Sequence, residues 1–342
     1  MTKKYVLCGC NFGGREFLSV IGREKVAYFC DDNYAGQWLD GVEIISTADL
    51  AKIYGAYEVI VTNIRDTANI ANNLAPHGIP FKMAFGSGDF FNFWKNLYRL
   101  SLLGMNIGGG GDVFDSGEVN ALQIMKTNWM GGGTEPILFD VGANVGKYTL
   151  ILRQIFNTAQ IHSFEPGHST FIALKNNISA AEKNYQEQIT LNNFGLSDAE
   201  TDSTLFYDKA ASGLASLYKR QLDYANIDFS QRETVHLTTL DKYCQVHGIN
   251  EINLLKLDVE GHEISVLNGA ANMLSARKIK NIQIEFGGCN LDSRTYFRDF
   301  WNLLHERYHV FYILRDSLTE IVKYEEQLEI FTTTNFFFHM RD

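Results

Sequence analysis

A glycine-rich turn with an acidic residue at its start lies near the middle of the chain. Asp140 ends an apolar run, and Gly142, Asn144 and Gly146 follow before a helix-forming stretch. A helix that starts behind such a turn presents free N–H groups and a partial positive charge, which suit a carboxylate. Asp140 can hold a cationic amine beside that carboxylate. The turn therefore predicts an amino-acid ligand, and S-adenosylmethionine carries this group.

A second acidic residue, Glu165, ends the next apolar run, 25 residues after Asp140. In open α/β sheets an acidic side chain at this place accepts hydrogen bonds from ribose hydroxyls. NAD also has a ribose, but its G-x-G-x-x-G fingerprint is not met, because Asn144 stands between Gly142 and Gly146. We therefore predict that Asp140, the turn residues Gly142, Asn144 and Gly146, and Glu165 bind S-adenosylmethionine.

Ser197 and Asp198 end a further apolar stretch and are the next predicted cofactor contacts. The Asp198 carboxylate can accept a hydrogen bond from an adenine amino group, and Ser197 can bond nearby. A solvated turn aspartate is the alternative interpretation. The order of the motifs along the chain favours contact with the ligand.

Candidate catalytic residues follow a later apolar run. Asp258 and Glu260 are two residues apart, so they face the same side if the strand continues, and His262 follows a glycine. A base at this place could take the proton of an acceptor hydroxyl, and His262 titrates near neutral pH. Two alternatives remain open: an ion pair between Lys256 and Asp258, and helix capping by Glu260 and Glu263.

Glu285 ends the following apolar run and is the fourth catalytic candidate. Acidic groups on two adjacent strand ends could hold Mg²⁺, which would lower the pKa of an acceptor hydroxyl. Alternatively, Glu285 binds substrate hydroxyls or a loop N–H. The oxygen ligands are sparse, so we predict no metal site. The segment 212–216 is expected to form a lid over the acceptor, with a plain surface loop as the alternative.

The elements that must position these residues alternate between strand and helix patterns in both halves of the chain. The chain has 342 residues, and domains have roughly 150 residues each, so its length suggests two domains. Alternating elements predict parallel, doubly wound α/β sheets. We expect a Rossmann-like N-terminal domain over residues 1–85, a helical and glycine-rich connector over 86–133, and the domain with the candidate site over 134–342.

The N-terminal half has its own degraded nucleotide fingerprint. Asn11 stands where a glycine would let a pyrophosphate approach, although Asp31 or Asp32 could still bind a ribose. A scaffold or interaction domain is the favoured interpretation. In the connector, apolar residues from Phe90 recur at helical spacing and predict a helix with one buried face, with membrane-surface attachment as the alternative. The glycine runs 108–111 and 131–133 are expected to be joints.

Composition excludes several classes of protein. The net charge of −10 argues against a nucleic-acid partner, because phosphate neutralisation requires a basic surface. No apolar run approaches the ~18 residues of a membrane span, and the N-terminus does not resemble a signal peptide. The five cysteines are odd in number and lack zinc-site spacing, so we expect reduced thiols and a cytoplasmic location.

Residues from about 115 to 338 resemble the FkbM family of S-adenosylmethionine-dependent methyltransferases. The motifs that carry the resemblance, in chain order, are Ser116-Gly-Glu118, FDVGANVGKYT, SFEP, LSD, TTLD, LLKLDVEGHE and the closing Thr334-Asn-Phe-Phe-Phe. The resemblance implies a class I methyltransferase sheet with a final antiparallel strand. It also implies O-methylation in most cases, often of sugars or polyketides. It does not cover residues 1–85.

We expect an S-adenosylmethionine-dependent O-methyltransferase that modifies a sugar or nucleotide sugar in the biosynthesis of a surface glycan polysaccharide, with a homo-oligomer as one possible state. Three alternatives stay open: an N-methyltransferase of amino sugars, an O-methyltransferase of lipids or polyketides, and a non-catalytic nucleotide-sugar-binding protein. A nicotinamide dehydrogenase built on residues 1–35 is disfavoured by Asn11.

Overall fold

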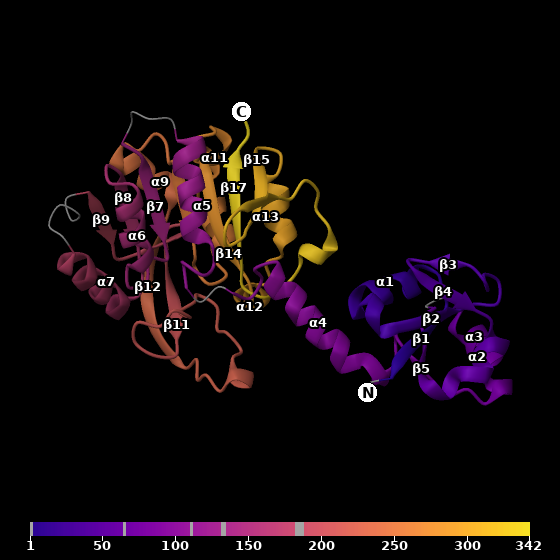
Figure 1. Ribbon diagram of the computed structural model, residues 1–342. Coiled ribbons are helices and arrows are strands. Elements are labelled where there is room, and N and C mark those ends of the chain that lie inside the picture. Colours follow the sequence, from indigo (N-terminus) through magenta and orange to yellow (C-terminus); the bar gives the residue numbers. More distant parts are fainter. Residues whose placement is uncertain (1–2, 64–65, 110–111, 131–134, 182–187) are drawn as a thin grey trace. The chain divides into compact units, whose positions relative to one another are not determined.

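The computed structural model describes residues 3–63, 66–109, 112–130, 135–181 and 188–342, which form two compact units, Met1–Ser101 and Leu102–Asp342 (Figure 1). Each unit is built on a largely parallel sheet with helices packed against it, which confirms the predicted α/β fold class. Gly110, Gly111 and the run 131–133, interpreted above as joints, lie outside the described residues.

The first unit contains a six-stranded sheet in the order β3-β4-β2-β1-β5-β6. All its pairs are parallel except β3 with β4. Its strands and main helices are β1 (Lys4–Cys8), α1 (Phe12–Ile21), β2 (Val26–Cys30), β3 (Trp38–Leu39), β4 (Val42–Ile45), α2 (Thr47–Ile53), β5 (Tyr57–Val61), α3 (Thr67–Leu74) and β6 (Phe81–Met83). The chain builds outward from β1 in one direction and then from β5 in the other, so these two strands mark a topological switch point.

Helices cover both faces of this sheet, and neighbouring residues of β1 point to opposite faces. Leu7 packs with Phe17 of α1, whereas Val6 and Cys8 pack with Leu50 of α2. Helix α4 (Phe91–Gly104) follows, and the rings of Phe93 and Trp94 at its start lie 6.4 and 5.8 Å from that of Phe17. The predicted helix is therefore present, but its rings are only partly covered: Trp94 is half-buried, Phe93 is 37% exposed, and Leu102 is the one residue of α4 that is buried.

The second unit contains an eight-stranded sheet in the order β16-β15-β17-β14-β13-β7-β8-β9, and a three-stranded sheet in the order β10-β12-β11. Its strands are β7 (Ile137–Val141), β8 (Gln160–Phe164), β9 (Ile189–Asn192), β10 (Gly195–Ser197), β11 (Thr201–Tyr207), β12 (Gln231–Thr239), β13 (Leu254–Leu257), β14 (Asn281–Phe286), β15 (Tyr308–Ile313), β16 (Leu318–Glu320) and β17 (Thr334–Met340). Its α-helices are α5 (Glu118–Ile124), α6 (Lys147–Ile155), α7 (His168–Ala180), α9 (Leu240–His247), α10 (Glu263–Asn268), α11 (Ala271–Ser275), α12 (Cys289–Ser293) and α13 (Phe297–Leu304).

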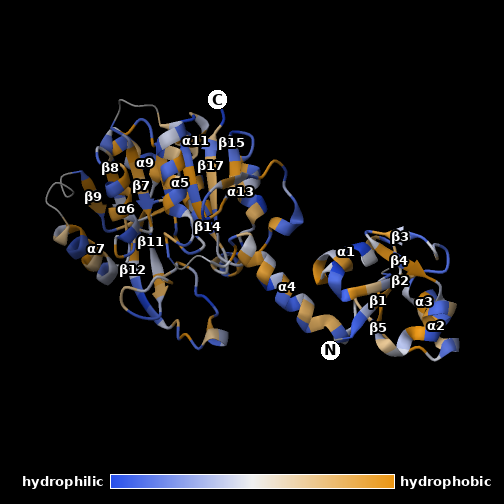
Figure 2. Ribbon diagram, in the orientation of Figure 1, coloured by the Kyte–Doolittle hydropathy of each residue, from blue (hydrophilic) through white to orange (hydrophobic). Residues whose placement is uncertain are grey.

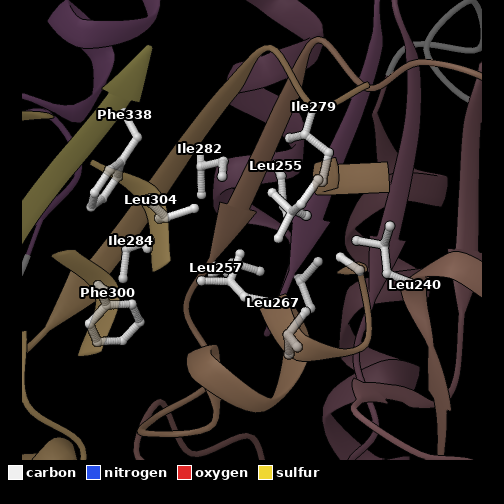
Figure 3. Close-up of a cluster of buried hydrophobic side chains, with 14 of the residues drawn as sticks. Leu240, Leu255, Leu257, Leu267, Ile279, Ile282, Ile284, Phe300, Leu304 and Phe338 are labelled. Atoms are coloured by element: carbon white, nitrogen blue, oxygen red, sulfur yellow. The ribbon is translucent and has the colours of Figure 1, made fainter. Parts of the chain in front are cut away.

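The central strands of the large sheet are parallel and almost continuously buried, as expected for strands covered on both faces. β17 enters between β14 and β15 and is antiparallel to both, as predicted. Helices α9, α10, α11 and α13 cover one face, where Leu240, Leu255, Leu267, Ile284 and Phe300 pack together (Figure 3). Helices α5 and α6 cover the other face. Figure 2 shows the apolar residues along the strands of this sheet.

The chain leaves β7 toward β8 and β9, and later returns on the other side of β7 as β13 and β14. The carboxyl ends of β7 and β13 therefore form a second switch point, where ligands bind in open α/β sheets. Gly142 lies here with φ of +88°, and a Cβ on this residue would stand 1.8 Å from the backbone oxygen of Asp258. Only glycine fits both the conformation and the space.

No helix among the described residues combines the length and apolar character needed to cross a bilayer.

We expect Gly142→Ala to destabilise the protein by about 2–5 kcal/mol, since it adds left-handed strain to a clash with fixed backbone. Gly248→Ala is the matched control: Gly248 also has positive φ, at +67°, but nothing lies within 4 Å of its Cβ position. The control should lose about 1–2 kcal/mol. Urea unfolding measures both, and equal losses would contradict the close approach at the switch point.

Candidate active site

The turn after β7 is fixed by backbone hydrogen bonds to the neighbouring strand. The N–H groups of Gly142 and Ala143 both donate to the Phe164 carbonyl oxygen, at 3.0 and 2.9 Å. Gly146 has φ of +87° and precedes helix α6, so the glycines predicted at the turn supply its left-handed conformations. The side-chain oxygen of Asn144 is buried and has no hydrogen-bond partner, although the residue lines a cleft. The turn thus holds an unsatisfied buried acceptor on a residue that borders the cleft.

Asp140 lies beneath this turn and does not line the cleft. It is 1% exposed and accepts a hydrogen bond from the Thr149 hydroxyl, which in turn lies 2.9 Å from the hydroxyl of Ser163. Burial raises its pKa to about 6, although Thr149 and the charge of Lys256 lower it. The structure therefore places Asp140 where it supports the turn from inside.

Glu165 ends β8 and lines the cleft beside the turn. Its carboxylate accepts hydrogen bonds from the backbone N–H of Asn144 at 3.0 Å and of Gly167 at 2.8 Å. A carboxylate has about four acceptor positions, so two remain for a ligand. Burial raises the pKa of Glu165 to about 7, against the lowering effect of the two N–H groups. Its charge thus changes near neutral pH.

Ser197 and Asp198 occupy a different place from the one predicted. The third parallel position of the large sheet is filled by β9, whereas β10, which ends at Ser197, pairs with β12 in the small sheet. Neither residue lines the cleft. The Ser197 hydroxyl donates to Asp198 at 3.0 Å and lies 2.9 Å from Nε2 of His262. The pair supports the histidine, a link that linear spacing could not reveal.

His262 lines the cleft, but both of its ring nitrogens are engaged. Since Ser197 donates to Asp198, its oxygen accepts from Nε2–H, which leaves Nδ1 to accept from the hydroxyl of Tyr218 at 3.2 Å. Burial lowers the pKa of His262, with Asp198 acting in the opposite direction. The network therefore favours a neutral imidazole in one tautomer, with no unengaged nitrogen.

Three of the predicted catalytic carboxylates converge. One oxygen from each of Asp258, Glu260 and Glu285 lies within 4.8 Å of the others. Asp258 and Glu260 are expected to face the same side if the strand continues. The strand does not continue, because β13 ends at Leu257 and Glu260 adopts φ of +51°. A turn brings them together instead.

The crowding of negative charge shifts these groups. Burial, followed by repulsion from Asp258, raises the pKa of Glu260 to about 8, although Arg220 lowers it. Burial and Asp258 likewise raise the pKa of Glu285 well above its usual value. Glu260 and Glu285 thus hold their protons to higher pH than free carboxyl groups do. The three oxygens have a spacing that a divalent cation could bridge.

Two buried cations balance this cluster. Arg220 lies 2.7 Å from Glu260 and 3.6 Å from Asp292. Lys256 lies 3.5 Å from Asp258 and 3.2 Å from Glu118, which confirms the ion pair considered for Lys256 and Asp258. Sequence reasoning missed Arg220, which stands in a polar segment 40 residues before Glu260 and carries no local signal.

Lys256 is the centre of a buried polar network behind the cluster. Glu118 also accepts hydrogen bonds from the Ser116 hydroxyl at 2.8 Å and the Gln283 side chain at 2.6 Å, and Gln283 accepts from Tyr148 at 2.7 Å. Burial lowers the pKa of Lys256, but the attraction of Asp258, Glu118 and Glu285 outweighs it and raises the pKa well above its usual value. Lys256 therefore remains charged and fixes the end of β13.

Glu263 braces the loop that carries Glu260 and His262. Its carboxylate is buried and accepts from the backbone N–H groups of Val259 and Gly261, both at 3.1 Å. The prediction that acidic groups cap this helix start thus applies to Glu263, the first residue of α10.

The cleft between these groups has a volume of about 90 Å³ and adjoins a hollow of about 410 Å³ that Asp258 and Glu260 also line. Glu285 and Arg220 line the hollow, and Ser212, Gly213, Ala215 and Leu217 form a wall of the cleft. The hydroxyl of Ser216 donates to the Glu260 carbonyl oxygen at 2.7 Å. The segment predicted as a lid thus lies against the carboxylate cluster and beside the turn.

Comparison with known families decides the assignment of this unit. The sequence profile of the methyltransferase FkbM domain matches residues 140–311, which include the turn, Glu165 and the carboxylate cluster. The chain belongs to the FkbM methyltransferase family.

The methyltransferase is similar to proteins from several organisms. It is 26% identical over 153 residues to the hexuronic acid methyltransferase AglP of Haloferax volcanii, covering 45% of this chain and 57% of that protein. It is 28% identical over 181 residues to the AMB antimetabolite synthetase AmbE of Pseudomonas aeruginosa, covering 44% of this chain and 8% of that protein. The chain therefore spans less than two-thirds of each relative.

A crystal structure of an FkbM methyltransferase from Methylobacillus flagellatus is 16% identical, with a TM-score of 0.40 over 98% of this chain and 90% of that one.

We expect Lys256→Met to cost about 3–5 kcal/mol of stability, because it leaves buried carboxylates without their cation. Adding Glu118→Gln should recover part of that loss by removing one of them. Lys280→Met is the control: Lys280 pairs with Glu251 at 3.3 Å on a more exposed surface, where an ion pair contributes about 0–1 kcal/mol. Urea midpoints measure all three, and similar losses for Lys256→Met and the control would contradict the network.

Proposed function

We propose that this chain is an S-adenosylmethionine-dependent O-methyltransferase that acts in the cytoplasm on a hydroxyl of a sugar or nucleotide sugar in surface-glycan biosynthesis. The observation that carries the proposal is the convergence of two groups at one switch point. Gly142 and Asn144 of the turn, together with Glu165, line the same cleft as Asp258, Glu260 and His262.

The residues beside the turn fit the cofactor by their chemistry. Asn144 has a buried acceptor without a partner, which an ammonium group can satisfy, and Glu165 has acceptor positions left for ribose hydroxyls. The bound cofactor supplies a methyl group already activated by a sulfonium. Asp140 acts from beneath the turn as a supporting carboxyl, and Gly142 and Gly146 set the backbone of the turn.

The cleft must widen for this function. Its volume of about 90 Å³ is smaller than the roughly 300–1,000 Å³ of small-molecule sites. The segment 212–217 is the wall we expect to move, since it forms one side of the cleft. Its return over the bound ligands would exclude water from the reacting groups.

The carboxylate cluster supplies the acid–base chemistry. The side chain of Asp258 is more exposed than that of Glu260: 36% of it is accessible, compared with 15% for Glu260. We assign Asp258 as the base that would accept the proton of the acceptor hydroxyl. The oxygen of that hydroxyl would bond to the methyl carbon as the bond between this carbon and sulfur breaks. Glu260 and Glu285 hydrogen bond acceptor hydroxyls, and His262 orients the acceptor as a neutral group held by Ser197 and Tyr218. Alignment of the acceptor contributes a further large part of the rate.

The sugar assignment has one supporting observation among the relatives, since AglP is described as a hexuronic acid methyltransferase. Clustered carboxylates with adjacent Arg220 are also groups that hydrogen bond readily to hydroxyls.

Cofactor binding should depend on the ionisation of Glu165. Its pKa of about 7 means that the carboxylate is charged above neutral pH, and a charged acceptor binds ribose hydroxyls more strongly. We expect S-adenosylhomocysteine to bind more tightly at pH 8 than at pH 6 in calorimetric titration. Glu165→Gln should weaken binding about tenfold at pH 8 and flatten this pH dependence.

Glu200→Gln is the control for this titration, because Glu200 is an exposed carboxylate that pairs with Lys242. It should bind as the parent does. Absence of binding in the parent protein would refute the cofactor assignment, and an unchanged pH profile in Glu165→Gln would refute the role of Glu165.

The base assignment can be tested with radiolabelled methyl donor and a pool of nucleotide sugars. We expect Asp258→Asn to lower kcat by about 10²–10⁴-fold with S-adenosylhomocysteine binding retained. His262→Ala should raise KM more than it lowers kcat, since His262 orients the acceptor. Full activity in both variants would favour an amine acceptor, which needs no base. Activity should also survive chelation by EDTA, whereas its loss would assign Mg²⁺ to the carboxylate cluster.

A further inference from the structure

The first unit contains a cavity of about 580 Å³ at the carboxyl edge of its sheet. Residues that follow β1, β2 and β5 line it, together with side chains of α3, so it lies at the switch point between β1 and β5. This is where open α/β sheets bind ligands. The volume is within the range of small-molecule sites.

One carboxylate in this cavity has acceptor positions available. Asp31 follows β2 and accepts from the Cys10 thiol at 3.2 Å and from the backbone N–H of Asn33 at 3.1 Å. About two of its four acceptor positions therefore remain. Burial and Asp31 raise the pKa of Cys10 to about 12, so the thiol remains a donor to that carboxylate. Asp32 is engaged differently, because it accepts from the N–H and hydroxyl of Thr47 at the start of α2.

Flat aromatic surface also lines the cavity. Trp38 is 68% exposed and Tyr34 is 49% exposed, and both line the cavity. Neither ring stacks on another ring within the described part of the chain. Carboxamides of Asn11, Asn69 and Asn73 add donors and acceptors around it. Such a combination matches a ligand with hydroxyls on its edge and an apolar face.

The charge of the cavity disfavours an anionic group. Its described lining includes the carboxylates Asp31, Asp32 and Asp66, and no Lys, Arg or His. The start of α1 does not compensate. Asn11 lines the cavity at the place where dinucleotide folds have the glycine that lets a pyrophosphate approach the backbone. Phosphate therefore lacks the approach that dinucleotide folds provide.

We infer that this cavity binds a neutral ligand through a vicinal diol that donates to Asp31 while its apolar face lies on Trp38. The diol can belong to the ribose of a nucleoside or to a pyranoside. The inference is independent of the proposed methyl transfer, because it concerns residues outside the FkbM match.

Saturation-transfer NMR on the full chain tests this inference with three probes: adenosine, methyl α-glucopyranoside and adenosine monophosphate. Because adenosine could also enter the methyltransferase cleft, the quantity that counts is the part of each signal lost in Asp31→Asn and in Trp38→Ala. We expect adenosine or the glucoside to bind at least about tenfold more weakly in both variants. We also expect adenosine monophosphate to show a smaller Asp31-dependent signal than adenosine.

Asp40→Asn is the matched control, since Asp40 is an exposed carboxylate of the same unit that pairs with Arg15 at 3.0 Å and does not line the cavity. It should retain the parent signals. Binding by adenosine alone would assign a nucleoside, and binding by the glucoside alone would assign a sugar. The inference is overturned if neither neutral probe gives a signal that depends on Asp31 and Trp38, or if the phosphate increases that signal.

Discussion

The backbone of Gly142 approaches the carbonyl oxygen of Asp258 so closely that no side chain can stand between them. This contact joins the turn after β7 to the turn after β13, where the large sheet changes its direction of growth. The turn 142–146, which we propose binds the cofactor, and the carboxylates that we propose as catalytic are distant in sequence and adjacent in space for this reason. The proposed reaction needs both at one edge, and the glycine makes that possible.

Charge balance is the second constraint on this edge. Lys256 and Arg220 each contact two carboxylates, and Glu118, Asp292, Asp258 and Glu260 are their partners. Without these cations, burial of so many acidic groups would cost several kcal/mol per uncompensated charge. Burial, together with repulsion from Asp258, raises the pKa values of Glu260 and Glu285. Structural stability and the proposed acid–base chemistry thus depend on the same side chains.

The sequence was sufficient to predict the role of a residue where that role follows from its neighbours in the chain. Apolar runs gave the parallel strands, and the glycines with positive φ gave the turn after β7. Sequence reasoning was insufficient where roles depend on contacts between distant segments. Ser197 ends a strand of the small sheet and, together with Asp198, supports His262, and Arg220 pairs with Glu260 across 40 residues. Similarly, the carboxylate cluster arises from the left-handed conformation of Glu260, which alternation along a strand does not predict.

The N-terminal unit shows the same limit in a different form. Its degraded fingerprint at Asn11 argued against a dinucleotide, but the cavity that Asp31 and Trp38 both line became visible only in three dimensions. A crystal structure of the full chain grown with S-adenosylhomocysteine tests the central claim most directly. The account predicts ligand density in the cleft that Gly142, Asn144 and Glu165 line, with the segment 212–217 displaced from its present position against that cleft. Density at another place, or a cleft that stays closed at saturating ligand, would contradict it.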